Sequence, residues 1–180
     1  MSDTEFLCVR CARHMKTCCQ TAQVYLTPGD VERIAEHTGR HDFHEFRGSD
    51  KPDYADQDDD PVWRDHVFRP DGTRRVLRRE PHGDCTFLGA DGCRLPLEVR
   101  PLICRIYPYD YDHRGLLNEL APGCPLELLP PRQSLTVALG MHREDAEGWH
   151  RQLYAEILQE RHEVEAAPSV SEQPALVHSA

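Results

Sequence analysis

Eight cysteines are the residues of this sequence whose type and spacing best suit a chemical role. They are Cys8, Cys11, Cys18, Cys19, Cys85, Cys93, Cys104 and Cys124. They make up about 4% of the chain, below the roughly 8–10% of a secreted disulfide scaffold. Thiolates are soft, anionic ligands, and several gather closely only where a cation neutralises their repulsion. The cysteines therefore favour metal binding over disulfides or ordinary buried thiols.

The first four cysteines form an N-terminal knuckle, Cys8-x2-Cys11-x6-Cys18-Cys19. The short first spacing suits two thiolates that converge on one ion, as in zinc knuckles and iron–sulfur loops. Adjacent side chains point about 100° apart on a helix and to opposite faces of a strand. We therefore expect Cys18 and Cys19 to serve two centres, or one of them to remain free.

The second cysteine group is expected on a hairpin, a short helix and a turn. Residues 83–95 read as a tight hairpin, which brings Cys85 back toward Cys93. A short helix restarting at Pro101 carries Cys104, and Cys124 follows in a Pro-Gly-Cys-Pro turn. Our leading hypothesis is a centre built by the hairpin and helix cysteines together with one or more N-terminal cysteines.

Two arginines, Arg100 and Arg105, flank Cys104. We expect them to bind the cofactor indirectly, by donating hydrogen bonds to thiolate sulfurs or neighbouring carbonyls. A second basic group lies in and just after the predicted strand 73–77. It comprises Arg74, Arg75, Arg78 and Arg79. A solvated strand face explains this group better than a docking patch for an acidic partner or RNA.

The remaining elements are predicted from caps and hydrophobic periodicity. Thr27 caps a helix that ends at Gly39, and a long helix begins at Ser134. A short helix is expected over 41–46, and a hairpin is expected from strands 62–68 and 73–77. The fold class is mainly α with short β-hairpins, in one small, irregular, metal-stabilised domain over 1–165. We expect a disordered tail over 166–180.

Composition excludes several classes of protein. The chain carries 21 basic and 31 acidic residues, a formal net charge of -10, which disfavours nucleic acid as a partner. No apolar run approaches the roughly 18 residues of a membrane span, and the first residues lack a signal-peptide pattern. We therefore expect a cytoplasmic protein without membrane contact, whose thiols stay reduced.

The sequence resembles the YkgJ-type CxxCxxCC cysteine-cluster family. The matching segments are residues 6–11, 18–19, 25–31, 83–88, 91–93 and, most specifically, RPLICRIYP at 100–108. The resemblance implies chelation of zinc or iron. The family includes flagellin lysine-N-methylases, which are associated with an iron–sulfur cluster. Six residues separate Cys11 from the Cys18-Cys19 pair, longer than the family's compact form, so which cysteines share an ion stays open.

Three functions follow from these observations. Eight thiolates suffice for two four-cysteine zinc or iron–sulfur centres, with 4Fe–4S as one cluster type, or for one cluster with spare thiols. The leading function is metal binding through cysteine thiolates. One alternative is an iron–sulfur enzyme of redox or protein methyl transfer, although the chain has no Gly-x-Gly loop after a strand to hold a cosubstrate. The other is a metal carrier or adaptor with a protein partner.

Overall fold

A computed structural model of the chain describes residues 7–51 and 59–166. The helices are α1 (Leu7–His14), α2 (Cys18–Thr21), α3 (Pro28–Thr38), α5 (Pro61–His66), α6 (Leu102–Ile106), α7 (Leu135–Ala138) and α8 (Arg143–Ala166), with 3-10 turns η1 (Leu97–Val99) and η2 (Leu126–Leu128). The strands are β1 (His44–Gly48), β2 (Thr73–Leu77), β3 (Leu88–Gly89), β4 (Gly92–Cys93), β5 (Tyr109–Asp112) and β6 (Gly115–Leu120). The predicted mixture of helices and short hairpins is confirmed; its stabilisation by metal stays a prediction.

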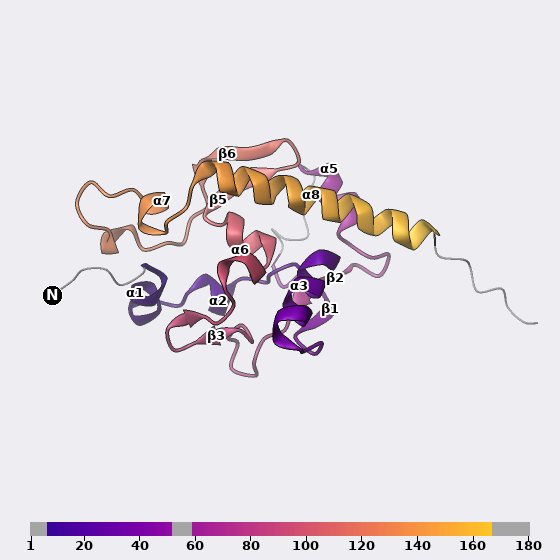
Figure 1. Ribbon diagram of the computed structural model, residues 1–180, viewed down its shortest axis with the longest axis horizontal. Helices are drawn as coiled ribbons and strands as arrows, with labels where there is room; N and C mark the ends of the chain where they lie inside the picture. The colour runs from indigo at the N-terminus through magenta and orange to yellow at the C-terminus, as the bar shows by residue number, and fades with distance from the viewer. Residues whose placement is uncertain (1–6, 52–58, 167–180) are drawn as a thin grey trace, which may run out of the picture.

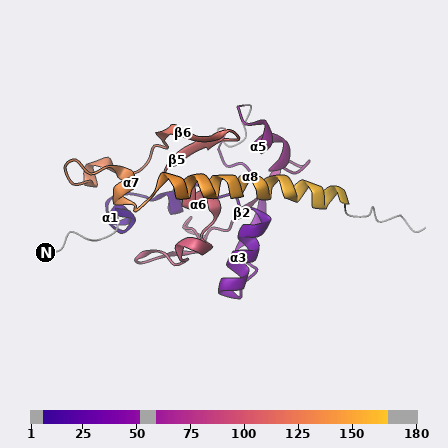
Figure 2. The same cartoon turned by 45° about the horizontal axis from the view of Figure 1, so that its top comes forward.

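Helix α8 runs along much of the molecule (Figure 1). The β5–β6 hairpin lies on one side of it, while α6, α3 and the N-terminal helices lie on the other (Figure 2). The apolar stripe of α8 is buried at Ala146, Leu153 and Ile157. These residues pack in one apolar cluster with Tyr25, Trp63, Leu102 and Ile106. The chain therefore anchors α6, the helix that carries Cys104, on α8.

A second apolar cluster lies beneath the cysteine hairpin. It contains Leu26, Ile34, Phe43, Leu77, Phe87, Leu95 and Val99, and Cys85 and Cys93 pack against it. The hairpin itself is short, since β3 and β4 pair only through Leu88 with Cys93 and Gly89 with Gly92. Hairpins of this length are marginal alone. The apolar cluster therefore has to hold the two cysteines in place.

Helix α3 confirms the prediction over this segment. The Thr27 hydroxyl accepts from the Asp30 N–H at 3.0 Å, and the Asp30 carboxylate accepts from the Thr27 N–H at 3.2 Å. This reciprocal capping satisfies two backbone donors at the helix start. Gly39 ends the helix in the left-handed conformation, with φ of 66°.

Two element predictions are wrong. Residues 41–46 were expected to be helical, but His44–Gly48 forms β1, which pairs antiparallel with β2 from His44 opposite Leu77 to Gly48 opposite Thr73. The strand expected over 62–68 is instead helix α5, because Asp60 caps it by accepting from the Trp63 N–H at 3.0 Å. The Asp-Pro pair that starts α5 is a common helix start.

The long helix predicted from Ser134 is divided in two. Gly140 adopts φ of 61° between α7 and α8, a left-handed conformation that ends a helix. The second part reaches Ala166, the first residue of the predicted tail. The rest of that tail, 167–180, lies outside the described residues. No helix in the described part of the chain combines the length and apolarity that crossing a membrane requires.

Candidate metal centre

The eight cysteines come from six places along the chain. Cys8 and Cys11 lie on α1, Cys18 and Cys19 on α2, Cys85 before β3, Cys93 on β4, Cys104 on α6, and Cys124 before η2. All eight thiols are free. In both ribbon views, α1, α2, the hairpin and α6 lie away from the C-terminal end of α8 (Figures 1 and 2). The fold thus gathers thiols that are far apart in sequence.

A first group of thiols surrounds α1. Burial raises the pKa of the Cys8 thiol to about 12, and repulsion from Cys18, Cys124 and Cys11 adds to the shift. Burial also raises the pKa of Cys11, again with repulsion from Cys124 and Cys18. Helix α1 contacts η2, which follows Cys124. We refer to Cys8, Cys11, Cys18 and Cys124 as the α1 group.

Two contacts fix α1 against the segment after Cys124. His14 Nε2 lies 2.9 Å from Glu127 Oε1, and the Arg10 guanidinium donates to the Leu128 carbonyl. The basic residues of the knuckle thus connect the two chain segments that supply this group.

A second group of thiols surrounds the hairpin. Hydrogen bonding to Cys18 and burial raise the pKa of Cys19, with repulsion from Cys18, Cys104 and Cys85. Burial raises the pKa of Cys104 well above 9.0, with repulsion from Cys18, Cys85 and Cys93. We refer to Cys19, Cys85, Cys93 and Cys104 as the hairpin group.

Helix α2 is where the two groups meet. The side chains of Cys18 and Cys19 share a hydrogen bond, which lowers the pKa of Cys18 to about 7 against the opposing effect of burial. Cys18 interacts electrostatically with the α1 group and with Cys85 and Cys104 of the hairpin group. Adjacent residues on a helix usually differ in direction, but this pair lies within hydrogen-bonding reach and therefore joins the two groups.

One backbone and one side-chain hydrogen bond hold α2 against the hairpin segment. The Cys85 N–H donates to the Cys19 carbonyl at 2.8 Å. The Gln20 side chain donates to the Asp84 carboxylate at 3.0 Å, and its own amide oxygen accepts from the Thr17 N–H at 3.1 Å. These contacts set the spacing between Cys19 and Cys85.

Helix α6 is held by a buried carboxylate. Asp30, which is 0% exposed, accepts from the Leu102 N–H at 3.0 Å and from Arg33 at 2.7 Å. Burial raises the pKa of Asp30, while the hydrogen bonds from Arg33, Thr27 and Leu102 oppose that rise. Arg33 also pairs with Glu156 of α8 at 2.6 Å. The first turn of the Cys104 helix is therefore fixed to α3 and, through it, to α8.

Tyr107 is a neighbour of the cysteines that counting thiols does not find. Its hydroxyl accepts a hydrogen bond from the Cys124 thiol at 3.6 Å and donates to the Pro122 carbonyl at 3.2 Å. The sequence feature that could have identified Tyr107 is its position in the RPLICRIYP segment, three residues after Cys104. Hydrogen bonds to ligating sulfurs tune a metal site, so the hydroxyl is placed to act on Cys124.

Arg100 and Arg105 hydrogen-bond to carbonyls. Arg100 Nε donates to Leu95 at 3.0 Å, and Arg105 Nε donates to the Arg100 carbonyl at 2.6 Å. Arg105 is buried, and its Nη2 lacks a hydrogen-bond partner among the described residues. Arg100 also opposes the rise in the pKa of Cys8, since its positive charge favours the thiolate. Their predicted role in binding a cofactor stays a prediction.

The donor set fits zinc or iron by its chemistry. Cys8, Cys18 and Cys104 are exposed residues. The protein atoms around the sulfurs of Cys8 and Cys104 nevertheless shield them enough to raise their pKa. Within residues 7–51 and 59–166, no three Cys, His, Asp or Glu side chains stand as close as ion ligation requires. Metal binding therefore requires rotation of the cysteine side chains, which exposed rotamers permit.

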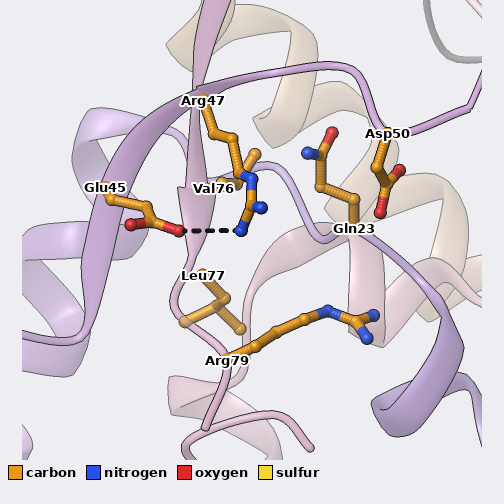
Figure 3. A pocket seen from close by; sticks show the side chains of 7 residues that line it. All are labelled: Gln23, Glu45, Arg47, Asp50, Val76, Leu77 and Arg79. Atoms are coloured by element: carbon orange, nitrogen blue, oxygen red, sulfur yellow. Dashed lines mark hydrogen bonds and ion pairs between the residues drawn. The ribbon is translucent and has the colours of Figure 1, made fainter. Parts of the chain in front are cut away.

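Neither of two surface cavities involves the cysteines. One, of about 150 Å³, lies beside β1 and β2 and is lined by Gln23, Glu45, Arg47, Asp50, Val76, Leu77 and Arg79 (Figure 3). The other, of about 370 Å³, lies between the β5–β6 turn and α8, and includes Arg114, Arg143 and His150. The clustered sulfurs, and not a cavity, define the candidate site.

The fold is a small, mainly helical domain that carries eight free thiols on or beside short elements. The family model CxxCxxCC, "Putative zinc- or iron-chelating domain", matches residues 7–125. The chain belongs to this family, and the match includes every cysteine. Comparisons with curated proteins and with solved structures gave no match. Family membership supports metal binding, with zinc or iron as the metal.

Proposed function

We propose that this chain binds zinc or iron through two neighbouring sets of four thiolates, the α1 group and the hairpin group. The observation that carries the proposal is that the knuckle lies against the hairpin segment, where the Cys85 N–H donates to the Cys19 carbonyl at 2.8 Å, in a chain of the zinc- or iron-chelating family. Cysteine thiolates from six chain segments would repel one another if they lay close together, and a bound cation would offset that repulsion.

The raised thiol pKa values support the same proposal. Burial and mutual repulsion disfavour the thiolates of Cys8, Cys11, Cys19, Cys85, Cys104 and Cys124 in the absence of a cation. A bound metal reverses this balance, because coordination deprotonates a thiol outright. Metal binding would therefore release protons and stabilise the folded chain.

Four thiolates suit two kinds of centre. Zinc with four cysteines is tetrahedral and has no open position, so it serves structure. A four-cysteine iron–sulfur cluster, such as 4Fe–4S, also serves electron transfer. The cytoplasmic location expected from the sequence would keep the eight thiols reduced and available.

The experiment is anaerobic purification followed by elemental analysis and a visible spectrum, on wild type, Cys104→Ser and Cys124→Ser. We expect zinc, or iron with sulfide, in the wild type. Each variant should lose one centre and keep the other, because the two cysteines belong to different groups. Asp42→Ala is the control and should keep full metal content, since its carboxylate forms an exposed pair with Arg40.

A wild-type protein that binds neither metal under reducing conditions would overturn the proposal. If both cysteine variants lose all metal together, the chain holds one centre, and the division into two groups is wrong. Broad visible absorption with iron and sulfide selects the cluster, and a colourless zinc-loaded protein selects the structural ion.

The exposure of three thiols favours a metal carrier as the second candidate. Cys8, Cys18 and Cys104 are exposed, and a reachable thiolate permits ligand exchange with a chelator or acceptor. We expect exchange with a thiol chelator within minutes if the chain is a carrier. Retention of the metal over hours would remove this candidate.

A further inference from the structure

Arg79 lies between the two chain segments that carry Cys19 and Cys85. Its Nη1 donates to the Gln20 carbonyl at 2.9 Å and to the Gly83 carbonyl at 2.8 Å. Its Nη2 donates to the Ala22 carbonyl. The sequence favoured a solvated strand face for this arginine, but the side chain is half-buried and has three carbonyl partners.

Two of the three carbonyls that Arg79 binds lie at the end of α2. The last carbonyls of a helix have no partner within it, and Gln20 and Ala22 lie at the end of α2. The third acceptor, Gly83, stands two residues before Cys85 in a tight turn in which its N–H donates to Glu80 at 2.8 Å. One planar guanidinium therefore joins both segments.

Arg79 also pairs with Cys85 through the backbone. The two residues form an isolated antiparallel bridge, and the Cys85 N–H continues to the Cys19 carbonyl at 2.8 Å. The backbone of Cys85 thus lies between the strand end that carries Arg79 and helix α2. The Arg79 guanidinium adds hydrogen bonds to carbonyls of both segments.

The hydrogen bonds of Arg79 go to backbone carbonyls and not to a carboxylate among the described residues. In Figure 3 the side chain extends away from the Glu45–Arg47 ion pair. Among the described residues, its guanidinium donates hydrogen bonds to carbonyls only. Its positive charge favours the Cys85 thiolate, although burial is the larger effect on that thiol and raises its pKa.

We propose that Arg79 is a positioning residue for the hairpin group, which holds the backbone segments of Cys19 and Cys85 side by side through the carbonyls of Gln20, Ala22 and Gly83. The role rests on the proposed metal-binding function. Lysine cannot replace it, because one ammonium lacks the planar fork that spans several acceptors.

The test follows zinc-dependent protection of each cysteine from alkylation, by mass spectrometry on the full chain under reducing conditions. The variants are Arg79→Ala, Arg79→Lys and the control Arg78→Ala. Arg78 is the adjacent residue, and its exposed side chain pairs with Glu45 at 3.9 Å. Unfolding of each zinc-loaded variant is measured in parallel.

We expect Arg79→Ala to raise the zinc concentration that half-protects Cys19 and Cys85 by about 10- to 100-fold, the usual effect of removing a group that orients metal ligands. Arg79→Lys should be impaired nearly as much, because it restores the charge only. Protection of Cys8 and Cys11 should match the wild type, and Arg78→Ala should match it at every cysteine.

Two results would overturn the role of Arg79. One is protection in Arg79→Ala that equals protection in Arg78→Ala. The other is equal loss at all eight cysteines with less cooperative unfolding, which would make Arg79 a general stabiliser of the fold. Absence of zinc protection in the wild type is a different result: it would refute the proposed function itself, and the positioning role with it.

Discussion

The Asp30 carboxylate accepts a hydrogen bond from the Leu102 N–H at 3.0 Å, so α3 holds the first turn of the helix that carries Cys104. The acceptor is 0% exposed, and it also binds Arg33 and the Thr27 N–H. A single side chain therefore satisfies donors from two helices. This relationship connects the apolar scaffold to the candidate metal centre.

Asp30→Ala should destabilise the protein and weaken metal binding by the hairpin group. The substitution leaves the Leu102 and Thr27 N–H groups and the Arg33 guanidinium without their acceptor, and each buried unsatisfied donor costs about 1–3 kcal/mol. We expect a loss of at least about 2 kcal/mol in urea unfolding at fixed zinc. Asp42→Ala is the control: its carboxylate forms an exposed pair with Arg40 and should change little. Equal stability of the two variants would contradict this account.

Gly29→Ala should destabilise the protein although alanine is the better helix former. A Cβ at Gly29 would lie 2.6 Å from the Glu156 carboxylate, which binds Arg33 and Thr27. Displacing that carboxylate should cost about 1–3 kcal/mol, more than the gain in helix propensity.

Gly148 provides the matched control. It also lies within a helix, but a Cβ there would meet nothing closer than Arg151 Nη2 at 3.9 Å. Gly148→Ala should therefore stabilise the protein by up to about 1 kcal/mol. Thermal unfolding of both variants measures the contrast, and shifts of the same sign would be inconsistent with it.

Folding stability should decrease as the pH falls below about 6.5, partly through His44. Burial lowers the pKa of His44, and the positive charges of Arg75, Arg78 and His41 add to the effect. The unfolded chain then binds a proton before the folded chain does, so the contribution of neutral His44 is present above the unfolded pKa and is lost as pH falls toward the folded pKa.

An NMR titration of the His44 ring should give a midpoint below 6.5, the ordinary pKa of histidine. His44→Gln should reduce the loss of stability between about pH 7 and pH 5. A midpoint above the ordinary pKa, or an unchanged pH dependence in the variant, would refute the assignment.

Removing the metal should loosen the cysteine segments and leave α8 in place. Helix α1 buries only Leu7 and Cys11, whereas α8 packs through Ala146, Leu153 and Ile157 in the larger apolar cluster. After chelation, hydrogen exchange should increase over 7–22 and 83–95, with little change in α8. Uniform exchange along the whole chain would show that the apolar cluster does not fold without metal.

Capping residues and hydrophobic periodicity predicted those helices whose bounds depend on neighbouring residues in the sequence. Thr27, Asp30 and Gly39 give α3 its bounds, and the apolar stripe around Leu153 identifies α8 as a core helix. Strand β1 was not predictable in this way, because its backbone partners lie in β2, about 30 residues along the chain.

The cysteines were identifiable as candidate ligands from their type, but the grouping proposed for them was not predictable. Spacing indicated that Cys18 and Cys19 diverge, yet which thiols each one meets depends on how α1, α6 and the hairpin pack. The contacts of Arg79 and Asp30 were missed for the same reason, since their acceptors and donors come from distant segments. Family membership adds the metal but not this geometry.

The hairpin that carries Cys85 and Cys93 rests on Phe87 and Leu95, which are almost fully buried among side chains from α3 and the segment before it. A synthetic peptide of residues 83–95 would expose Phe87 and Leu95 to water, and it would lose the conformation that brings its two cysteines together. Transplanting this half of the site into another scaffold would therefore require moving α3 with it.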